Sequence, residues 1–304
     1  MLRSVLLYLS EQKRLQDFIL KRKLARRVSR RFVAGETLDE AVGVVCDLNA
    51  HGMEVTLDHL GESVEREHQA VQATEDYIEI LERIDKQQGG TATISIKPTQ
   101  IGLAIDPDLC RRNLRRLAEE ARARGNFVRI DMESSDFTEL TLTVFYELFE
   151  EFKNLGVVIQ SYLRRSEADV RQLAALAAPV RLCKGAYKEP AELAFQKKSE
   201  VNDSFVRLAE ILMDSEAPLA VATHDGLMIE AAKLLMRDRP DRRAPVEFQM
   251  LYGIRRDLQA QLVEDGYRMR IYVPYGNEWY PYFMRRMAER PANLFFVLRA
   301  MGGK

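Results

Sequence analysis

The chain has 304 residues, of which 46% are hydrophobic and 30% are charged. This composition is typical of a folded globular protein and excludes a disordered one. The net charge of −1 gives no reason to expect a nucleic acid as a partner.

Residues 1–50 are predicted to form an N-terminal helical segment, because apolar residues recur there at helical spacing. Within it, residues 13–32 form a basic amphipathic stretch, for which a solvated helix face is favoured over contact with a membrane surface or a partner. Thr37 and Glu40 stand in a capping-box arrangement. They predict the start of a helix that ends at His51.

Eight short, β-rich apolar runs follow, and longer helical patterns separate them. Most successive runs begin roughly 25–40 residues apart, the length of one βα unit. Eight such units favour closure into a barrel over an open sheet, and a (β/α)8 barrel typically needs ~250 residues. The predicted fold class is therefore α/β, with a (β/α)8 catalytic barrel over residues 51–304. The runs are residues 53–60, 91–98, 127–133, 157–163, 180–185, 219–225, 246–251 and 270–276.

The polar residues that end these runs are candidate site residues, because (β/α)8 enzymes carry their active sites at the C-terminal ends of the strands. The set is rich in cations, which suggests an anionic ligand such as a phosphorylated cofactor or a carboxylate. Asp58 and His59 also fit a simple strand-end turn and are left out of the predicted site. The others include Lys97, Asp131, Gln160, Tyr162, Arg181, Lys184, Tyr187, Thr223, His224, Asp225, Gln249 and Tyr272.

A final helix is predicted after the eighth run. Pro281 suits the first turn of a helix, and Pro291 ends it. Glu289 lies four residues after Arg285 and three after Arg286, so either pair can form a surface ion pair worth about 0.2–0.5 kcal/mol. On spacing alone, a solvated face is favoured over a ligand-binding role for the adjacent arginines.

Five motifs in fixed order carry a specific resemblance. They are RLCKGAY, ATHDG, FQMLYG, RIYVPYG and YPYFMRRMAERPAN, and together they resemble the proline dehydrogenase family. The likeness extends from Asp58 to Arg299, and the short length is similar to that of the monofunctional bacterial enzymes. It implies non-covalent FAD in the barrel mouth, with the Arg-Arg helix over that mouth. It also implies oxidation of L-proline to Δ1-pyrroline-5-carboxylate by hydride transfer to the flavin, with the electrons passed to a quinone.

The resemblance also implies roles for individual residues. Asp131 and Arg181 match the catalytic pair, an acid that organises the cationic cluster and an arginine beside the reactive flavin nitrogen. Substrate-binding positions are matched by Lys97, Arg285 and Arg286 at the carboxylate and by Leu182, Tyr187 and Tyr272 around the ring. FAD-contacting positions are matched by Met132, Gln160, Arg181, Lys184, Gly185, Ala186, Thr223 and His224. Glu289 matches the partner of a helix arginine in an ion pair that latches the helix over the site.

One departure concerns Lys188, which stands where some longer, bifunctional relatives have a tryptophan after the KGAY motif. Stacking of the adenine at that position is therefore in doubt. The N-terminal helices match no motif of the family.

Three alternatives remain open at this point. The first is a metal-dependent barrel hydrolase with His59, Asp131, His224 and Asp225 as ligands, although the cationic mouth would repel a divalent cation. The second is another barrel flavoenzyme that acts on a small carboxylate. The third is a non-catalytic binding protein, which would not need so many polar groups at the strand ends. The favoured reading predicts no metal site.

Cysteine usage predicts the compartment. The three cysteines, Cys46, Cys110 and Cys183, match neither a disulfide framework nor a metal-binding spacing. They favour a reducing, cytoplasmic location. A quinone acceptor adds the expectation of peripheral contact with the inner face of the plasma membrane, since no apolar run reaches the ~18 residues of a membrane span.

Overall fold

The computed structural model describes residues 29–61, 64–87, 91–242 and 245–289, and the side chains of all of these except residues 242 and 285–289. Residues 1–28 lie outside the described part, and so does most of the predicted N-terminal helical segment. The division of the chain at residue 50 therefore stays a prediction.

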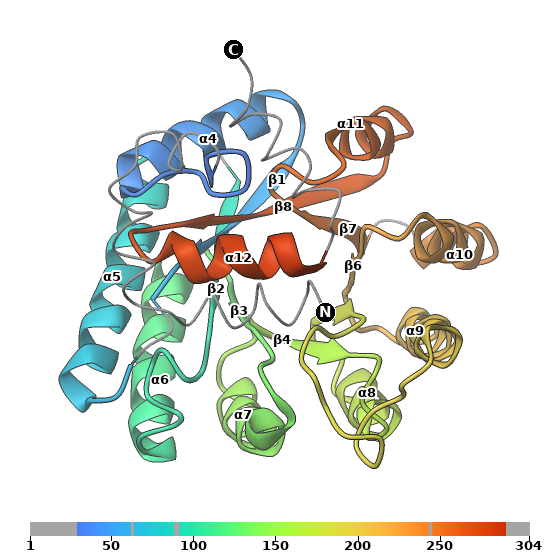
Figure 1. Cartoon of the computed structure of the whole chain (residues 1–304), viewed down its shortest axis with the longest axis horizontal. Helices are drawn as coiled ribbons and strands as arrows, with labels where there is room; N and C mark the ends of the chain where they lie inside the picture. The colour runs from blue at the N-terminus through green and yellow to red at the C-terminus, as the bar shows by residue number, and fades with distance from the viewer. Residues whose placement is uncertain (1–28, 62–63, 88–90, 243–244, 290–304) are drawn as a thin grey trace.

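Eight parallel strands form a closed barrel in the order β1 to β8, so the predicted fold is confirmed (Figure 1). Each strand pairs with its sequence neighbour, and β8 closes the barrel on β1. The strands are β1 (Glu54–His59), β2 (Ala92–Ile96), β3 (Val128–Ile130), β4 (Leu155–Gln160), β5 (Val180–Cys183), β6 (Leu219–Ala222), β7 (Val246–Leu251) and β8 (Arg268–Tyr275). The predicted runs match them, although β3 is shorter than its run and β8 begins two residues earlier.

Helices surround the barrel between successive strands (Figure 1). They are α5 (Glu67–Asp85), α6 (Pro107–Ala123), α7 (Ser135–Phe149), α8 (Ser166–Ala175), α9 (Lys198–Met213), α10 (Gly226–Arg237), the short η1 (Pro240–Arg242) and α11 (Arg256–Glu264). Before the barrel comes α4 (Leu38–Ala50), which contacts β1 and β8. Its capping box is confirmed, because Glu40 N–H donates to Thr37 Oγ1 and Thr37 N–H donates to Glu40 Oε2, each at 3.3 Å.

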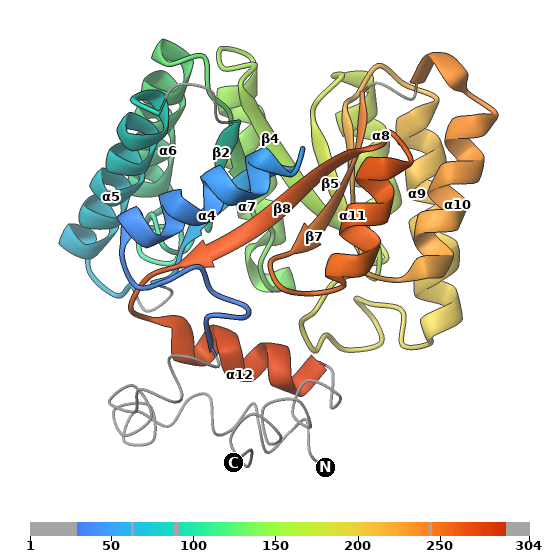
Figure 2. The same ribbon diagram turned by 90° about the horizontal axis from the view of Figure 1, so that it is seen from above.

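The last helix, α12 (Trp279–Glu289), lies across one end of the barrel. It crosses the centre of the barrel in Figure 1 and lies beyond the strand tips in Figure 2. Because α12 directly follows β8, this end is the C-terminal face of the strands, where barrel enzymes carry their active sites. The predicted placement of this helix over the barrel mouth is confirmed.

The interior of this barrel is unusually polar. Many (β/α)8 barrels fill their centre with layers of branched apolar side chains. Here the apolar strand residues pack in the main core with the helices, whereas the alternate residues carry charges. Arg181 on β5 bonds to Ser95 on β2, and Arg270 on β8 bonds to Thr93 on β2. Because these strands are not neighbours, the bonds must cross the interior.

A tight crossing joins the segment before α4 to the loop after β7. Gly253 has φ +77°, and a Cβ built on it would lie 1.7 Å from the carbonyl oxygen of Arg31. Gly253→Ala should therefore lower the free energy of unfolding by roughly 2–5 kcal/mol, from backbone strain and overpacking. Gly43→Ala is the matched control, because a Cβ there meets nothing within 4 Å and should stabilise α4 by about 0.5–1 kcal/mol. Urea denaturation measures the free energy of unfolding of both variants. An equal change in the two would contradict the close approach of Gly253 to the backbone of Arg31.

Candidate active site

Asp131 is the centre of a buried polar cluster at the C-terminal ends of the strands. Its Oδ1 accepts hydrogen bonds from Ser95 Oγ at 2.8 Å and from Arg181 Nη1 at 2.7 Å. Its Oδ2 accepts one from the hydroxyl of Tyr272 at 2.7 Å. Residues from β2, β5 and β8 therefore converge on one carboxylate just after β3, and three of the predicted site residues lie together.

Arg181 is held on several sides. Its Nε donates to Gln249 Oε1 at 2.5 Å, and its Nη1 donates to both Ser95 and Asp131. Its guanidinium carbon lies 5.3 Å from the centroid of the Tyr272 ring. Although Arg181 is only 5% exposed, its Nη2 has no hydrogen-bond partner among the described residues. A buried guanidinium with unused donors is suited to bind a polar ligand atom.

Tyr272 stays protonated in this cluster. Burial raises its pKa well above the ordinary value for tyrosine, and the neighbouring carboxylates of Asp131 and Asp58 raise it further. The hydroxyl is therefore a hydrogen-bond donor to Asp131 over the whole working pH range.

Lys97 forms a buried ion pair that the sequence did not reveal. Its Nζ donates to both carboxylate oxygens of Asp58, at 2.7 and 2.8 Å, and Asp58 is 1% exposed. On the far side, the Tyr77 hydroxyl lies 3.1 Å from Gln100 Oε1, to which it donates, and 3.4 Å from Asp58 Oδ1. Asp58 was left out of the predicted site. The sequence did hold a signal for it, because residues at every second position of a strand share a face, and Asp58 therefore shares the interior face of β1 with Glu54.

Two predicted cofactor residues lie at the ends of β3 and β4. Gln160 Nε2 donates to the carbonyl oxygen of Glu133 at 2.8 Å. The Glu133 carboxylate in turn accepts hydrogen bonds from the backbone and the hydroxyl of Thr99. Met132 is buried in the main apolar core. These bonds fix the loops after β2 and β3 to each other.

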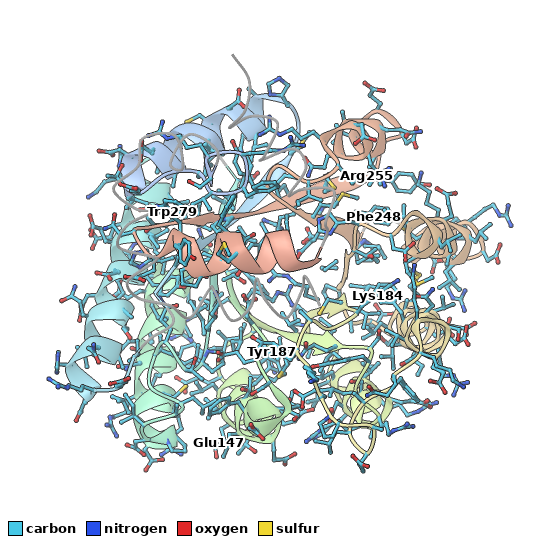
Figure 3. All side chains as sticks on the ribbon, viewed as in Figure 1. Glu147, Lys184, Tyr187, Phe248, Arg255 and Trp279 are labelled. Carbon is cyan, nitrogen blue, oxygen red and sulfur yellow. The ribbon has the colours of Figure 1, made fainter. Side chains whose placement is uncertain are left out.

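The loop between β5 and α9 carries four of the predicted residues. Gly185 has φ +104°, and a Cβ on it would lie 2.2 Å from the ring of Tyr162, so only glycine fits there. Lys184 Nζ donates to Asp225 and to Asn202, each at 2.6 Å. The Lys184 bond holds the pKa of Asp225 below its ordinary value. Tyr187 is 44% exposed, and Figure 3 shows Lys184 and Tyr187 on the α7–α9 side of α12.

Thr223 and His224 lie just after β6. The Thr223 hydroxyl accepts a hydrogen bond from Asp225 N–H at 3.1 Å. His224 Nε2 accepts one from the backbone N–H of Leu251 at 3.0 Å. Because a backbone N–H can only donate, Nε2 carries no proton, and the imidazole is the neutral tautomer with its proton on Nδ1.

Four further predicted residues are not seen in contact with the cluster among the described side chains: Leu182, Arg285, Arg286 and Glu289. Leu182 is fully buried in the main apolar core, and it alternates along β5 with Arg181, whose side chain points inward. Arg285, Arg286 and Glu289 belong to α12, but their side chains lie outside the described residues. The roles predicted for all four stay predictions.

The four residues of the metal-site alternative are used elsewhere. Asp131 is bound to Arg181, Asp225 to Lys184, and His224 to the backbone of Leu251, whereas His59 lies 3.6 Å from Asp76. In the part of the chain that the structure describes, no three histidine, cysteine or acidic side chains gather as a metal site would require. No observation favours the hydrolase alternative.

A closed parallel barrel with a buried, cation-rich cluster at the carboxyl ends of its strands defines the class: a (β/α)8 enzyme with its site under α12. The family model described as proline dehydrogenase matches residues 41–299. The chain belongs to the proline dehydrogenase family and is an oxidoreductase of that family.

Individual relatives agree with this assignment. Proline dehydrogenase 1 of Bacillus subtilis is 42% identical over 99% of both chains, and proline dehydrogenase of Deinococcus radiodurans is 37% identical over 98% of this chain and 97% of its own. Among solved structures, proline utilization A from Bdellovibrio bacteriovorus, inactivated by N-propargylglycine, matches with a TM-score of 0.82 and 28% identity. That match covers 92% of this chain but only 34% of the other.

Proposed function

We propose that this barrel oxidises L-proline to Δ1-pyrroline-5-carboxylate with FAD as its cofactor. The observation that carries the proposal is the buried Arg181, which is oriented by Asp131, Ser95 and Gln249 while its Nη2 has no partner among the described residues. Such a group fits the polar edge of a flavin. When bound, FAD supplies the acceptor for the hydride that leaves the substrate.

The residues present also fit the rest of the cofactor. Lys184 places an ammonium group at the end of β5, beside the N-terminus of α10, where an anionic pyrophosphate is stabilised. The left-handed backbone of Gly185 lets a ligand approach closely. We assign Met132, Gln160, Lys184, Gly185, Ala186, Thr223 and His224 to this cofactor site.

Proline has few groups that a protein can recognise, and its carboxylate is the main one. Lys97 presents an ammonium group that Asp58 holds in place, and we assign Arg285 and Arg286 of α12 to the same carboxylate. Tyr187 and Tyr272 are assigned to the wall around the five-membered ring, whereas Leu182 is buried in the main apolar core. Glu289 is assigned as the ion-pair partner that holds α12 over the bound substrate.

Asp131 organises the cluster rather than removing a proton. Its two oxygens accept three hydrogen bonds, from Ser95, Arg181 and Tyr272. Both oxygens of this carboxylate are therefore already occupied by hydrogen-bond donors. Its role is to orient the side chains of Arg181 and Tyr272. The positive charge of Arg181 would stabilise the negative charge that a flavin gains on reduction.

The test is an absorption spectrum of the purified protein before and after anaerobic L-proline. A flavin spectrum that bleaches with proline would support both cofactor and substrate. A flavin spectrum that does not change with proline would support FAD as the cofactor and reject L-proline as the substrate. A colourless protein that takes up no added FAD would reject the proposal.

We also propose that the electrons pass to a quinone. No helix within the described residues is long and apolar enough to cross a membrane, so the proposal places the protein in the cytoplasm with peripheral contact at the inner face of the plasma membrane. Reoxidation of the proline-reduced protein by a soluble quinone, compared with molecular oxygen, tests the acceptor. Oxygen reacting as fast as the quinone would contradict it.

Arg285→Met and Arg286→Met should each weaken proline binding while FAD stays bound. Removing one charged donor from a buried carboxylate costs about 2–5 kcal/mol, or roughly 30-fold or more in KM. Steady-state kinetics measures KM, and the flavin absorbance per protein is the control. Wild-type affinity for proline in either variant would show that the carboxylate assignment is wrong.

Glu189 should position the β5–α9 loop without touching the substrate. Its carboxylate accepts hydrogen bonds from the backbone and hydroxyl of Ser135, at 2.8 and 2.5 Å, and so joins this loop to the start of α7. Glu189→Ala should make the loop around Tyr187 less ordered. At a cost of roughly 1 kcal/mol in binding free energy, KM for proline should rise about five-fold. Glu192 is an exposed residue of the same loop, and Glu192→Ala is the control. An equal change in KM in the two variants would show that the bonds from Ser135 to Glu189 do not position Tyr187.

A further inference from the structure

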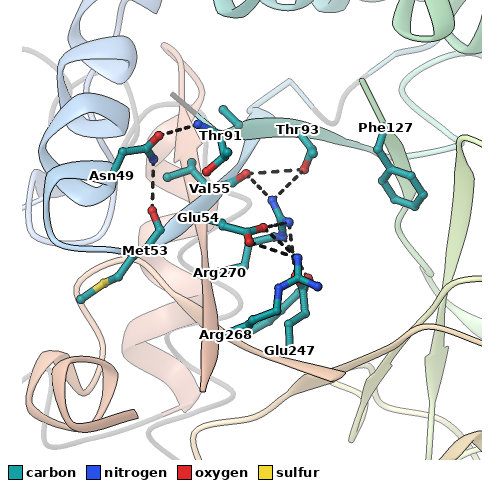
Figure 4. A network of polar contacts seen from close by, with 12 residues as sticks. Asn49, Met53, Glu54, Val55, Thr91, Thr93, Phe127, Glu247, Arg268 and Arg270 are labelled. Atoms are coloured by element: carbon teal, nitrogen blue, oxygen red, sulfur yellow. Dashed lines mark hydrogen bonds and ion pairs between the residues drawn. The ribbon is translucent and has the colours of Figure 1, made fainter. Parts of the chain in front are cut away.

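A continuous line of hydrogen bonds runs through the barrel interior to Arg181. At the opposite end of the barrel from the site, Arg270 on β8 forms ion pairs with Glu54 on β1 and Glu247 on β7. Figure 4 shows Glu54, Glu247 and Arg270 pointing toward one another. Gln249, two residues after Glu247 on the same strand face, joins this group to Arg181.

The orientation of the Gln249 amide is fixed by the charges on its two sides. A guanidinium can only donate hydrogen bonds and a carboxylate can only accept them. The amide oxygen must therefore face Arg181, and the amide nitrogen must donate to Glu247. Gln249 is 4% exposed, and the reversed orientation would set the amide nitrogen against the Arg181 donor and the amide oxygen against the Glu247 carboxylate.

Glu247 is itself immobilised. Arg270 Nε donates to its Oε1 at 2.9 Å and Arg270 Nη2 to its Oε2 at 3.2 Å, in a two-bond pairing. Arg270 Nη1 is fixed in turn by the carbonyl oxygen of Val55 at 2.9 Å. Burial opposes ionisation of Glu247, but Arg270 outweighs it and keeps the pKa of Glu247 below its ordinary value. The carboxylate that orients Gln249 is thus charged and held by the strand backbone.

We propose that Gln249 is a positioning residue for the redox reaction. It draws Arg181 Nε toward β7 and thereby keeps the guanidinium from turning wholly onto Asp131, so that Nη2 remains available to the flavin. This inference rests on the proposed function. It predicts that a change at Gln249 alters the redox behaviour of the bound flavin through Arg181, to which the Gln249 side chain is bonded.

Gln249→Met is the primary test, and Gln259→Met is its matched control. Gln259 is also a buried glutamine, at 2% exposure, but its amide donates to the backbone carbonyls of Leu251 and Ile254, away from Arg181. Both variants lose buried hydrogen bonds, so both should melt at a lower temperature than the wild type. Only Gln249→Met should change the flavin.

The expected change has a direction. Without the Gln249 oxygen, Arg181 moves toward Asp131 and stabilises the reduced flavin less. The two-electron reduction equilibrium should shift at least tenfold toward the oxidised form, which is about 30 mV lower in midpoint potential. The limiting rate of reduction by L-proline should fall at least tenfold. Affinity for cyclopentanecarboxylate, a ring carboxylate that has no amine to oxidise, should change less than threefold.

Reductive titration with dithionite and a reference dye measures the potential without any need for proline. Equal potentials in Gln249→Met and wild type, or the same shift in Gln259→Met, would overturn the inference. If Gln249→Met does not fold, Gln249→Leu replaces it, since leucine also removes the oxygen that accepts from Arg181 Nε. Its potential should fall in the same way, and an unchanged potential would overturn the inference equally. A wild-type flavin that proline does not bleach would instead reject the proposed substrate.

Discussion

Arg181→Met is expected to slow reduction of the flavin by L-proline about 10²–10³-fold, the usual cost of removing a preorganised group that stabilises developing charge. The variant removes the buried cation whose Nη2 has no partner among the described residues, while Asp131 keeps its bonds from Ser95 and Tyr272. Anaerobic stopped-flow measurement of flavin bleaching gives the rate. The midpoint potential should fall in the same variant.

Arg129→Met is the control for loss of a buried guanidinium. Arg129 also lies inside the barrel on β3, but its Nη1 donates to the carbonyl oxygens of Val157 and Pro179, at 3.2 and 2.7 Å, and not to the site. It should lose stability while its rate of flavin reduction stays within a few-fold of the wild type. Equal slowing in the two variants would show that Arg181 acts through the fold alone.

Lys97→Met is expected to lower the free energy of unfolding by about 3–5 kcal/mol, because it leaves the Asp58 carboxylate buried without its cation. The double variant Lys97→Met with Asp58→Asn has neither charge and should recover most of that stability. Its affinity for proline should not recover, since the proposed carboxylate donor is still missing. If stability and affinity for proline both recovered, the assignment of Lys97 to the substrate carboxylate would be wrong.

The stability defect of Lys97→Met should also depend on pH. Burial raises the pKa of Asp58 in the folded protein, and Lys97 opposes that rise, so the variant should raise the pKa further. The folded state then binds a proton more tightly than the unfolded chain, whose aspartate pKa is about 3.9. Stability is therefore lost as pH rises from the unfolded pKa to the folded one. Urea denaturation from pH 4 to 8 should show the deficit relative to wild type growing with pH, whereas a constant deficit would contradict the buried pair.

The barrel could be predicted from the sequence because each βα unit repeats the same pattern. Every run that ends in a polar residue became a strand, from β1 to β8. The strand ends also identified Lys97, Asp131, Arg181 and Tyr272, since a closed parallel barrel brings all its carboxyl ends to one face. Topology made these four residues candidates, but their roles came from the resemblance to the family and stay predictions.

The partners within the site could not be predicted in the same way. Gln249 on β7 binds Arg181 on β5, two strands away, whereas Asp58 on β1 binds Lys97 just after the neighbouring β2. A sequence shows which residues share a strand face, but not which of them meet across a barrel. The polar alternation of Glu54, Thr56 and Asp58 indicated an interior face that needed charged partners, and only the closed structure identifies these partners.

The ion pairs between β1 and β8 have a consequence for synthesis of the chain. Arg268 donates to Glu54 at 3.0 Å across a separation of 214 residues, and β8 pairs with β1 from Glu54 to His59. At 5–20 residues per second, a ribosome needs about 10–40 s to make that intervening length. Until then the growing sheet has an open β1 edge, which is a template for pairing with other chains. Closure of the barrel must be a late event, and a nascent chain stalled before β8 should depend on chaperones to stay soluble.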